Sequence, residues 1–186
     1  GHTSGVKALH AIDNENSFMS ASRDRTVKLW SMRSQGDGSH VSNCQSTYSH
    51  HKKTLFAVSY LQSIRMAASC DSSIHIWDPF HGSMVHQVDS QRLGPVQVMK
   101  TASSNPTPLI YAASLDSNVH VIDCRTGTVV YDLKVCIGSP GGIKSLCISP
   151  DGGDLAVGHS SGYISCVDLR SGKLKHAWKV RTVGWG

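Results

Sequence analysis

The chain has 186 residues, of which 39% are hydrophobic and 17% are charged. These proportions are typical of a globular protein and exclude a disordered or coiled-coil chain. The sequence has neither an apolar run of the roughly 20 residues that a membrane span needs nor a signal peptide at Gly1-His2-Thr3, so we expect a soluble protein.

Charge and cysteine usage narrow the class of protein further. The net charge is +5, but the basic residues are spread along the chain, with one modest cluster at Arg23, Arg25, Lys28 and Arg33. A nucleic-acid-binding surface would be more densely basic, so we expect no nucleic-acid partner. The six cysteines form no C-x-x-C pair, which indicates reduced thiols, no disulfides and a cytoplasmic protein.

Four copies of one pattern follow each other along the chain, with a period typical of repeat architectures. Each copy ends in a similar apolar segment: Val27–Ser31, Ile74–Asp78, Val119–Asp123 and Ile164–Asp168. The anchor positions 30, 77, 122 and 167 are separated by 47, 45 and 45 residues. Six residues before the anchor, three copies have an aspartate: Asp24, Asp71 and Asp116. Eight residues before it, the same copies have a serine: Ser22, Ser69 and Ser114.

Short strand-like runs separated by turn residues make up each copy, as in an antiparallel β-meander. In the fourth copy the predicted strands are residues 143–148, 154–158, 163–167 and 174–178. The sequence Pro150-Asp151-Gly152-Gly153 is a strong turn signal between the first two of them. Four strands per copy predict one propeller blade per repeat.

Two copies also carry a G-H and W-D signature, in Gly1-His2 with Trp30 and in His51 with Trp77-Asp78. On these residues the chain resembles the WD40 family, whose repeats of about 40 to 45 residues are four-stranded blades. The third and fourth copies lack the His and the Trp. Residues 22–31 and 69–80 resemble, more narrowly, the propellers of BEACH–WD40 scaffold proteins.

The resemblance implies an all-β WD40 β-propeller with four four-stranded blades. We assign the repeats to residues 1–48, 49–91, 92–135 and 136–180, with a non-repeat tail at 181–186. Closed propellers have about four to eight blades, and the resemblance to the WD40 family implies a ring that typically has about seven. We therefore expect an incomplete ring that is part of a larger propeller, and a tail that arose by read-through or truncation.

The repeat columns also bring together Ser, His and Asp, the residue types of a hydrolase triad, in two of the copies. One protein has little reason to build the same active site twice at one blade spacing, and a triad needs an exposed nucleophile. The resemblance instead implies a buried hydrogen-bond network within each blade, so we expect no enzyme. The predicted network residues are His2, Ser22, Asp24, Trp30, His51, Ser69, Asp71, Trp77, Ser114 and Asp116.

Aspartates are predicted to set the turns of each blade. Those of the first column lie at the tight turn between the second and third strands, and Asp78, Asp123 and Asp168 begin the next turn. Four residues after these three aspartates stands a glycine, which tolerates a positive φ: Gly82, Gly127 and Gly172.

The remaining histidines and cysteines give no sign of a metal or cofactor site. No pair has the spacing of zinc ligands, so we expect His75 and His120 at the blade surface. We expect Cys70, Cys147 and Cys166 to be buried small hydrophobes. No phosphate-binding glycine loop occurs, so we expect neither a metal nor a cofactor.

The sequence therefore predicts a non-catalytic scaffold for protein–protein interaction, because propellers present rigid ends whose loops carry function. The family resemblance implies docking at the end that bears the His-containing loops and the aspartate turns. The candidate contacts are Arg23, Arg25, Lys52 and Lys53, which would face an acidic or phosphorylated segment of a partner protein. The resemblance further implies endosomal membrane trafficking and autophagy, with indirect membrane association through a larger parent protein.

Two alternative functions stay open at this stage. A propeller that binds phosphoinositide membranes is one alternative, but the paired-arginine motif of such propellers is missing from this sequence. An enzyme on a propeller scaffold is the other alternative, and it would need a polar cluster in the central channel, supplied by unrelated columns of different blades.

Overall fold

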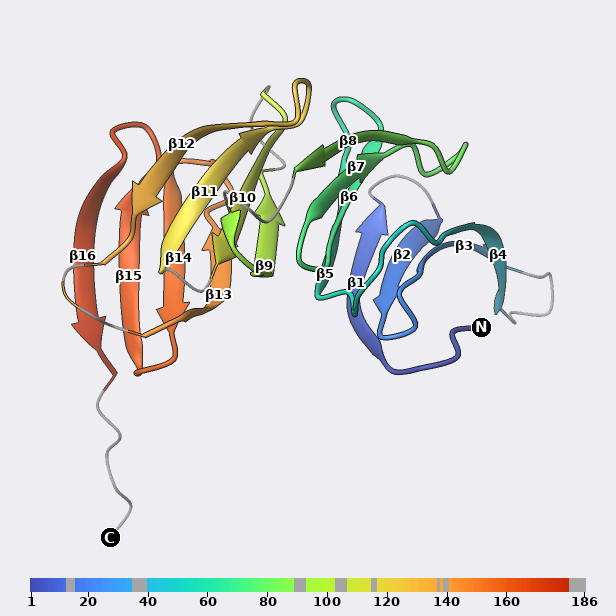
Figure 1. Cartoon of the computed structure of the whole chain (residues 1–186), viewed down its shortest axis with the longest axis horizontal. Helices are drawn as coiled ribbons and strands as arrows, with labels where there is room; N and C mark the ends of the chain where they lie inside the picture. Colours follow the sequence, from blue (N-terminus) through green and yellow to red (C-terminus); the bar gives the residue numbers. More distant parts are fainter. Residues whose placement is uncertain are drawn as a thin grey trace, which may run out of the picture.

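The computed structural model describes residues 1–12, 16–34, 40–88, 93–102, 107–114, 117–136, 138 and 141–180, and its architecture is all β. These residues form four four-stranded antiparallel sheets, each a meander of four consecutive strands (Figure 1). The expected fold class is confirmed: the sheets are four blades in an arc that is not a closed ring. In the part of the chain so described, no helix is long and apolar enough to cross a membrane.

Each sheet lies inside one predicted repeat, although the repeat boundaries themselves stay a prediction. The first blade contains β1 (Val6–Ile12), β2 (Ser17–Ser22), β3 (Val27–Ser34) and β4 (His40–Tyr48). The second contains β5 (Ala57–Leu61), β6 (Met66–Cys70), β7 (Ile74–Trp77) and β8 (Met84–Val88). The third contains β9 (Val96–Thr101), β10 (Leu109–Ser114), β11 (Asn118–Asp123) and β12 (Thr128–Lys134). The fourth contains β13 (Ile143–Ile148), β14 (Asp154–His159), β15 (Tyr163–Asp168) and β16 (Lys173–Lys179). Strand ends in this last blade lie within one residue of those predicted. The predicted tail, 181–186, falls outside the described residues.

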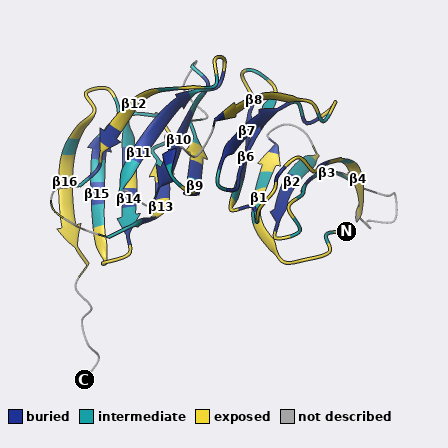
Figure 2. Ribbon diagram, in the orientation of Figure 1, coloured by how far each residue is buried: buried dark blue, intermediate teal, exposed yellow. Residues whose placement is uncertain are grey.

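The first strands of successive blades pack side by side on the inside of the arc. Strand β1 contacts β5, β5 contacts β9, and β9 contacts β13. The fourth strands therefore lie at the outer edge, where Figure 2 shows β4, β8 and β16 to be mostly exposed. At one end of every blade, therefore, lie the loop that enters from the preceding blade and the turn between the second and third strands.

Three hydrophobic cores hold the arc together, and each lies between two neighbouring blades. Because side chains alternate along a strand, one strand supplies two cores. In β10, Ile110 packs toward the second blade, whereas its neighbour Tyr111 packs toward the fourth. The two inner blades are therefore apolar on both faces, and each depends on its neighbours for burial.

The end blades show what happens where a face has no described neighbour. Leu9 and Val58 hold equivalent places, because each pairs with the serine of its blade's histidine network, Ser20 or Ser69. Val58 is 6% exposed, whereas Leu9 is 67% exposed. The sequence pattern is thus the same in both blades, and only the presence of a neighbour decides the burial.

The same effect corrects an expectation about the cysteines, all six of which have free thiols. Cys70 is fully buried, as expected, and burial raises the pKa of its thiol to about 12. Cys147 is exposed and Cys166 is only half-buried, so the prediction that both are buried was wrong. Cys147 alternates with Leu146, which packs in the core shared with the third blade, and so it faces away from that blade.

The turns between the third and fourth strands have one conformation in the last three blades. The carboxylate of Asp78 accepts the amide of Phe80 at 2.8 Å, and the amide of Gly82 donates to the Asp78 carbonyl at 2.8 Å. The glycine has a φ of 67°, and Gly127 and Gly172 have 64° and 67°. The predicted role of this glycine column is confirmed, because a side chain is disfavoured at such angles.

The core between the second and third blades predicts a large cost for removing a buried side chain. Ile76 is fully buried there, so Ile76→Ala should lower the free energy of unfolding by about 2 to 5 kcal/mol. The matched control is Val130→Ala, because Val130 is 55% exposed and its loss should change stability by less than about 0.5 kcal/mol. Urea denaturation measures both variants, and equal effects would contradict this description of the core.

Candidate functional site

The predicted network residues of the second blade meet at one buried site. The Nε2 atom of His51 lies 2.7 Å from the Oγ of Ser69, and the indole N–H of Trp77 donates to the same oxygen at 3.0 Å. The Nδ1 atom of His51 lies 3.3 Å from an oxygen of Asp71. The network therefore links the β4–β5 loop, strand β6, the β6–β7 turn and strand β7.

Asp71 is the most heavily bonded member of this network. One carboxylate oxygen accepts the backbone N–H of Ser73 at 2.8 Å and its hydroxyl at 3.0 Å. The other accepts the backbone N–H groups of Lys52 at 3.2 Å and Lys53 at 3.1 Å. Burial by itself raises the pKa of the Asp71 carboxyl, but the adjacent His51 ring and the hydrogen bonds from Ser73 and Lys53 outweigh it and hold that pKa well below its usual range. Asp71 is therefore charged, and donors within the protein stabilise its negative charge.

Tyr48, at the end of β4, extends the network from the first blade into the second. Its ring stacks on Trp77 with 4.1 Å between centroids, and its hydroxyl lies 3.0 Å from Nδ1 of His75. Nε2 of His75 lies 3.2 Å from the Oγ of Ser73. The expectation of a surface position for His75 was wrong, because this side chain is 4% exposed and stacks on His51 with 3.9 Å between centroids.

The first blade has the same network, with one serine different from the one predicted. Nε2 of His2 lies 2.7 Å from the Oγ of Ser20, and the indole of Trp30 donates to that oxygen at 2.8 Å. Nδ1 of His2 lies 2.8 Å from an oxygen of Asp24. The predicted Ser22 instead accepts the backbone N–H of Asp24 at 3.1 Å, and so it supports the turn.

Hairpin length explains this exchange of serines. In the first blade Ser20 pairs with Lys28, and in the second blade Ser69 pairs with His75, at the equivalent place. Ser20 precedes its turn aspartate by four residues, whereas Ser69 precedes its aspartate by two. Ser22 lies eight residues before Trp30, just as Ser69 lies eight residues before Trp77. Alignment of the repeats on the tryptophan therefore predicts Ser22 in place of Ser20.

The third and fourth blades retain only part of the pattern. The Oγ of Ser114 lies 3.2 Å from Nε2 of His120, whose Nδ1 lies 2.6 Å from Asp132. His120 is 4% exposed, so its predicted surface position was also wrong. In the fourth blade the histidine is on the second strand and the serine on the third, the reverse of the third blade. Nε2 of His159 lies 3.0 Å from the Oγ of Ser165. The predicted Asp116 lies outside the described residues.

The Ser69, His51 and Asp71 side chains have distances like those of a hydrolase triad, but their burial prevents that chemistry. Ser69 is 0% exposed, and its oxygen already accepts the indole N–H of Trp77. A nucleophilic serine must reach a substrate and have oxyanion donors beside it. The arrangement therefore cross-links strands. Within the described part of the chain, no three His, Cys, Asp or Glu side chains come together as a metal site.

Sequence reasoning missed a hydroxyl that completes each aspartate turn. The hydroxyl of Thr26 donates to Asp24 at 2.7 Å, as that of Ser73 does to Asp71 at 3.0 Å. Both stand two residues after the aspartate, so the repeat columns do carry this signal. Tyr48 had no such signal, because it comes from the preceding blade.

Exposed cationic side chains surround these two turns. The predicted contact residues Arg23, Arg25, Lys52 and Lys53 are all exposed. The backbone N–H of Leu55 donates to the carbonyl of Ser22 at 3.3 Å, so the β4–β5 loop contacts the end of β2, next to the β2–β3 turn. The four residues thus lie on two adjoining segments, at the end of the blades opposite the Asp78 turn.

Known proteins with similar sequences agree with this architecture. The family model for the WD domain, G-beta repeat, matches residues 1–31 and 42–78. The second match runs from β4 to β7, so the family's repeat joins the last strand of one blade to the first three of the next. With four such blades and two histidine networks, the chain belongs to the WD40 repeat family.

Among individual proteins, the chain is similar to WD repeat-containing protein 81. The Rattus norvegicus protein is 34% identical over 180 residues, which cover 96% of the chain and 9% of that protein. The Homo sapiens protein is 35% identical over 183 residues, with the same coverage. Suppressor of organelle fusion 2 of Caenorhabditis elegans is 35% identical over 176 residues, 94% of the chain and 12% of that protein. The chain spans about a tenth of the length of these relatives.

The bonding of Asp71 predicts a stability effect that depends on pH. At pH 7 Asp71→Ala should lower the free energy of unfolding by about 1 to 3 kcal/mol, because the buried donors lose their acceptor. The folded-state pKa of Asp71 lies below the ordinary value of 3.8. The stabilisation is therefore present above that value and is lost as the pH falls toward the folded-state pKa. Thermal melting should show a difference between wild type and variant that narrows below about pH 4. An unchanged melting temperature at pH 7 would contradict the prediction.

Proposed function

We propose that the chain is a non-catalytic protein-interaction module that binds an acidic segment of a partner protein at one end of its blades. The binding region, here named the basic loop surface, consists of Arg23, Arg25, Lys52 and Lys53 on the β2–β3 turn and the β4–β5 loop. The observation that carries this proposal is the hydrogen bond from Leu55 in the β4–β5 loop to Ser22, the residue before the β2–β3 turn, because it holds next to each other the two segments that carry the four exposed cations.

The electrostatics of the two loops favour an anionic partner. The neighbouring carboxylates, Asp24 in the β2–β3 turn and Asp71 in the β6–β7 turn, accept hydrogen bonds from the protein itself. Their negative charges are therefore directed inward, while the four cations face solvent. Among the described residues, Lys52 and Lys53 have no hydrogen-bond or ion-pair partner for their side chains. Such a surface attracts and orients an acidic segment.

The surface is also held in shape before any partner arrives. The amides of Lys52 and Lys53 are bonded to Asp71, and the amide of Arg23 donates to the carbonyl of Gly5 at 2.9 Å. A loop whose backbone is fixed loses little conformational entropy on binding. This rigidity supports the use of the end as a docking surface.

The similarity to known proteins suggests the setting of this interaction. One relative is named for suppression of organelle fusion, and others are WD repeat-containing protein 81. We place the module in a cytoplasmic protein of endosomal membrane trafficking and autophagy, associated with membranes only through the longer protein. Its partner would then be an acidic or phosphorylated segment of another trafficking protein.

Charge reversal on the basic loop surface tests this proposal. Arg23→Glu should leave the fold intact and weaken capture of acidic partners by about fivefold, a loss typical of one interface charge. The matched control is Arg170→Glu, which makes the same charge change on the β15–β16 turn at the other end of the blades. Quantitative mass spectrometry of proteins captured from a cell lysate measures the loss. Equal capture by wild type and Arg23→Glu would remove Arg23 from the site.

A further inference from the structure

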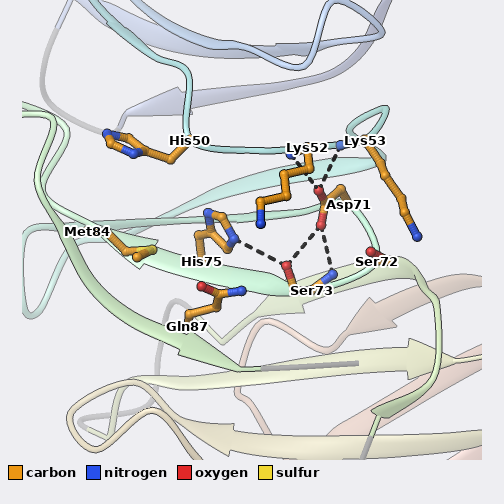
Figure 3. Close-up of a pocket in the computed structure, with 9 residues that line it drawn as sticks. All are labelled: His50, Lys52, Lys53, Asp71, Ser72, Ser73, His75, Met84 and Gln87. Atoms are coloured by element: carbon orange, nitrogen blue, oxygen red, sulfur yellow. Dashed lines mark hydrogen bonds between the residues drawn. The ribbon is translucent and has the colours of Figure 1, made fainter. Parts of the chain in front are cut away.

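A cavity of about 320 Å³ lies beside the second blade, next to the basic loop surface. This volume is at the lower end of the range for ligand sites. Figure 3 shows its walls, which come from the β4–β5 loop, the β6–β7 turn and strands β7 and β8. The lining includes Lys52, Ser72, His75, Met84 and Gln87, together with the carboxylate of Asp71, whose oxygens already accept hydrogen bonds from the protein.

The floor of the cavity is rigid and already hydrogen-bonded. Ser73 bridges Asp71 at 3.0 Å and His75 at 3.2 Å, and His75 in turn contacts the hydroxyl of Tyr48 at 3.0 Å. All four side chains are buried. A ligand therefore meets a preformed floor and does not need to reorganise it.

The mouth of the cavity, by contrast, has donors that lack acceptors. Figure 3 shows the Lys52 ammonium directed into the cavity, whereas Lys53 points away from it. In the described part of the chain, neither Lys52 nor Ser72 has a hydrogen-bond or ion-pair partner for its side chain. Met84, which is 44% exposed, adds an apolar wall. A ligand with a short apolar stem and an anionic head matches these groups.

The third blade differs from the second beside the equivalent histidine. The cross-strand partner of His75 is Gln87, and the cross-strand partner of the equivalent His120 is Asp132. Asp132 lies 2.6 Å from Nδ1 of its histidine, whereas Nδ1 of His75 contacts the hydroxyl of Tyr48. On this side of the cavity the second blade therefore has a neutral amide in place of a carboxylate, which lowers the repulsion that an anion would meet.

We propose that this cavity receives a phosphorylated side chain of the partner segment, with Lys52 as its main cationic contact and Ser72 as a hydroxyl donor. A phosphoryl group has about two negative charges and three acceptor oxygens, so it can use both the ammonium of Lys52 and the hydroxyl of Ser72. A carboxylate would leave part of this capacity unused. The inference rests on the proposed function and names the chemistry of the partner.

The test uses the 186-residue chain, isotope-labelled for NMR. The probe is acetyl-Ala-phosphothreonine-Ala-amide, compared with the same peptide carrying Thr or Glu. The phosphopeptide should shift the amide signals of Lys52, Lys53, Ser72 and Ser73, whereas the Thr peptide should not and the Glu peptide should bind more weakly. Lys52→Met should weaken the phosphopeptide about tenfold, as expected for one lost charge-assisted hydrogen bond. Lys134→Met, an exposed lysine in β12, is the matched control and should bind as wild type does.

Several results would overturn the inference. Equal binding of the phosphothreonine and Glu peptides would exclude a phosphate-selective site, and equal affinity of Lys52→Met and wild type would exclude the cavity. Phosphatidylcholine vesicles with and without phosphatidylinositol phosphate form a further arm. Binding to the phosphoinositide vesicles without binding to the phosphopeptide would indicate a membrane site instead. If the phosphopeptide does not bind while Arg23→Glu still loses partners, the cavity inference fails and the proposed function stands.

Discussion

The carboxylate of Asp71 is the interaction on which the rest of the second blade depends. It accepts four hydrogen bonds from the backbone of the β4–β5 loop and from Ser73, and His51 lies beside it. Through Ser73 the network reaches His75, and from there Tyr48 of the preceding blade. One buried charge thus fixes a turn, a loop and the joint between two blades. Hydrogen bonds are electrostatically stronger in such a buried setting than in water, so the network rigidifies the loop and the turn that it joins.

This constraint also explains why residues that look catalytic serve the fold. His51 and Ser69 are used within the strands, and Ser69 has no access to solvent. Recognition of a partner can therefore use only the exposed side of the β4–β5 loop, which carries His51. The backbone amides of Lys52 and Lys53 face Asp71, and their side chains are exposed. In Lys52 and Lys53 the backbone therefore holds the loop, and the side chains of the same residues are the groups that we propose to bind a partner.

Much of the fold was predictable from the sequence, because the strand pattern and turn residues recur with each repeat. The strands of the fourth blade agree with prediction to within one residue at each end, and the glycine column has the expected positive φ. Predictions failed where information from outside one repeat was needed. His75 was misplaced because its partner Tyr48 comes from another blade. Cys147 was misplaced because burial depends on a neighbouring blade and not on the strand itself. Ser22 was predicted in place of Ser20 because the β2–β3 hairpin is two residues longer than the β6–β7 hairpin. Counting back the same number of residues from the tryptophan in both blades therefore reaches Ser22 and misses Ser20.

The most direct test of this account is amide hydrogen exchange at Lys52 and Lys53, compared between wild type and Asp71→Asn. The variant keeps the size of the side chain and removes its charge. We predict that both amides are protected in the wild type and exchange faster in the variant, whereas the strands of the fourth blade, β13 to β16, exchange equally in both proteins. Faster exchange confined to the loop would show that the buried carboxylate holds the basic loop surface. Equal exchange of the two amides in both proteins would contradict the account.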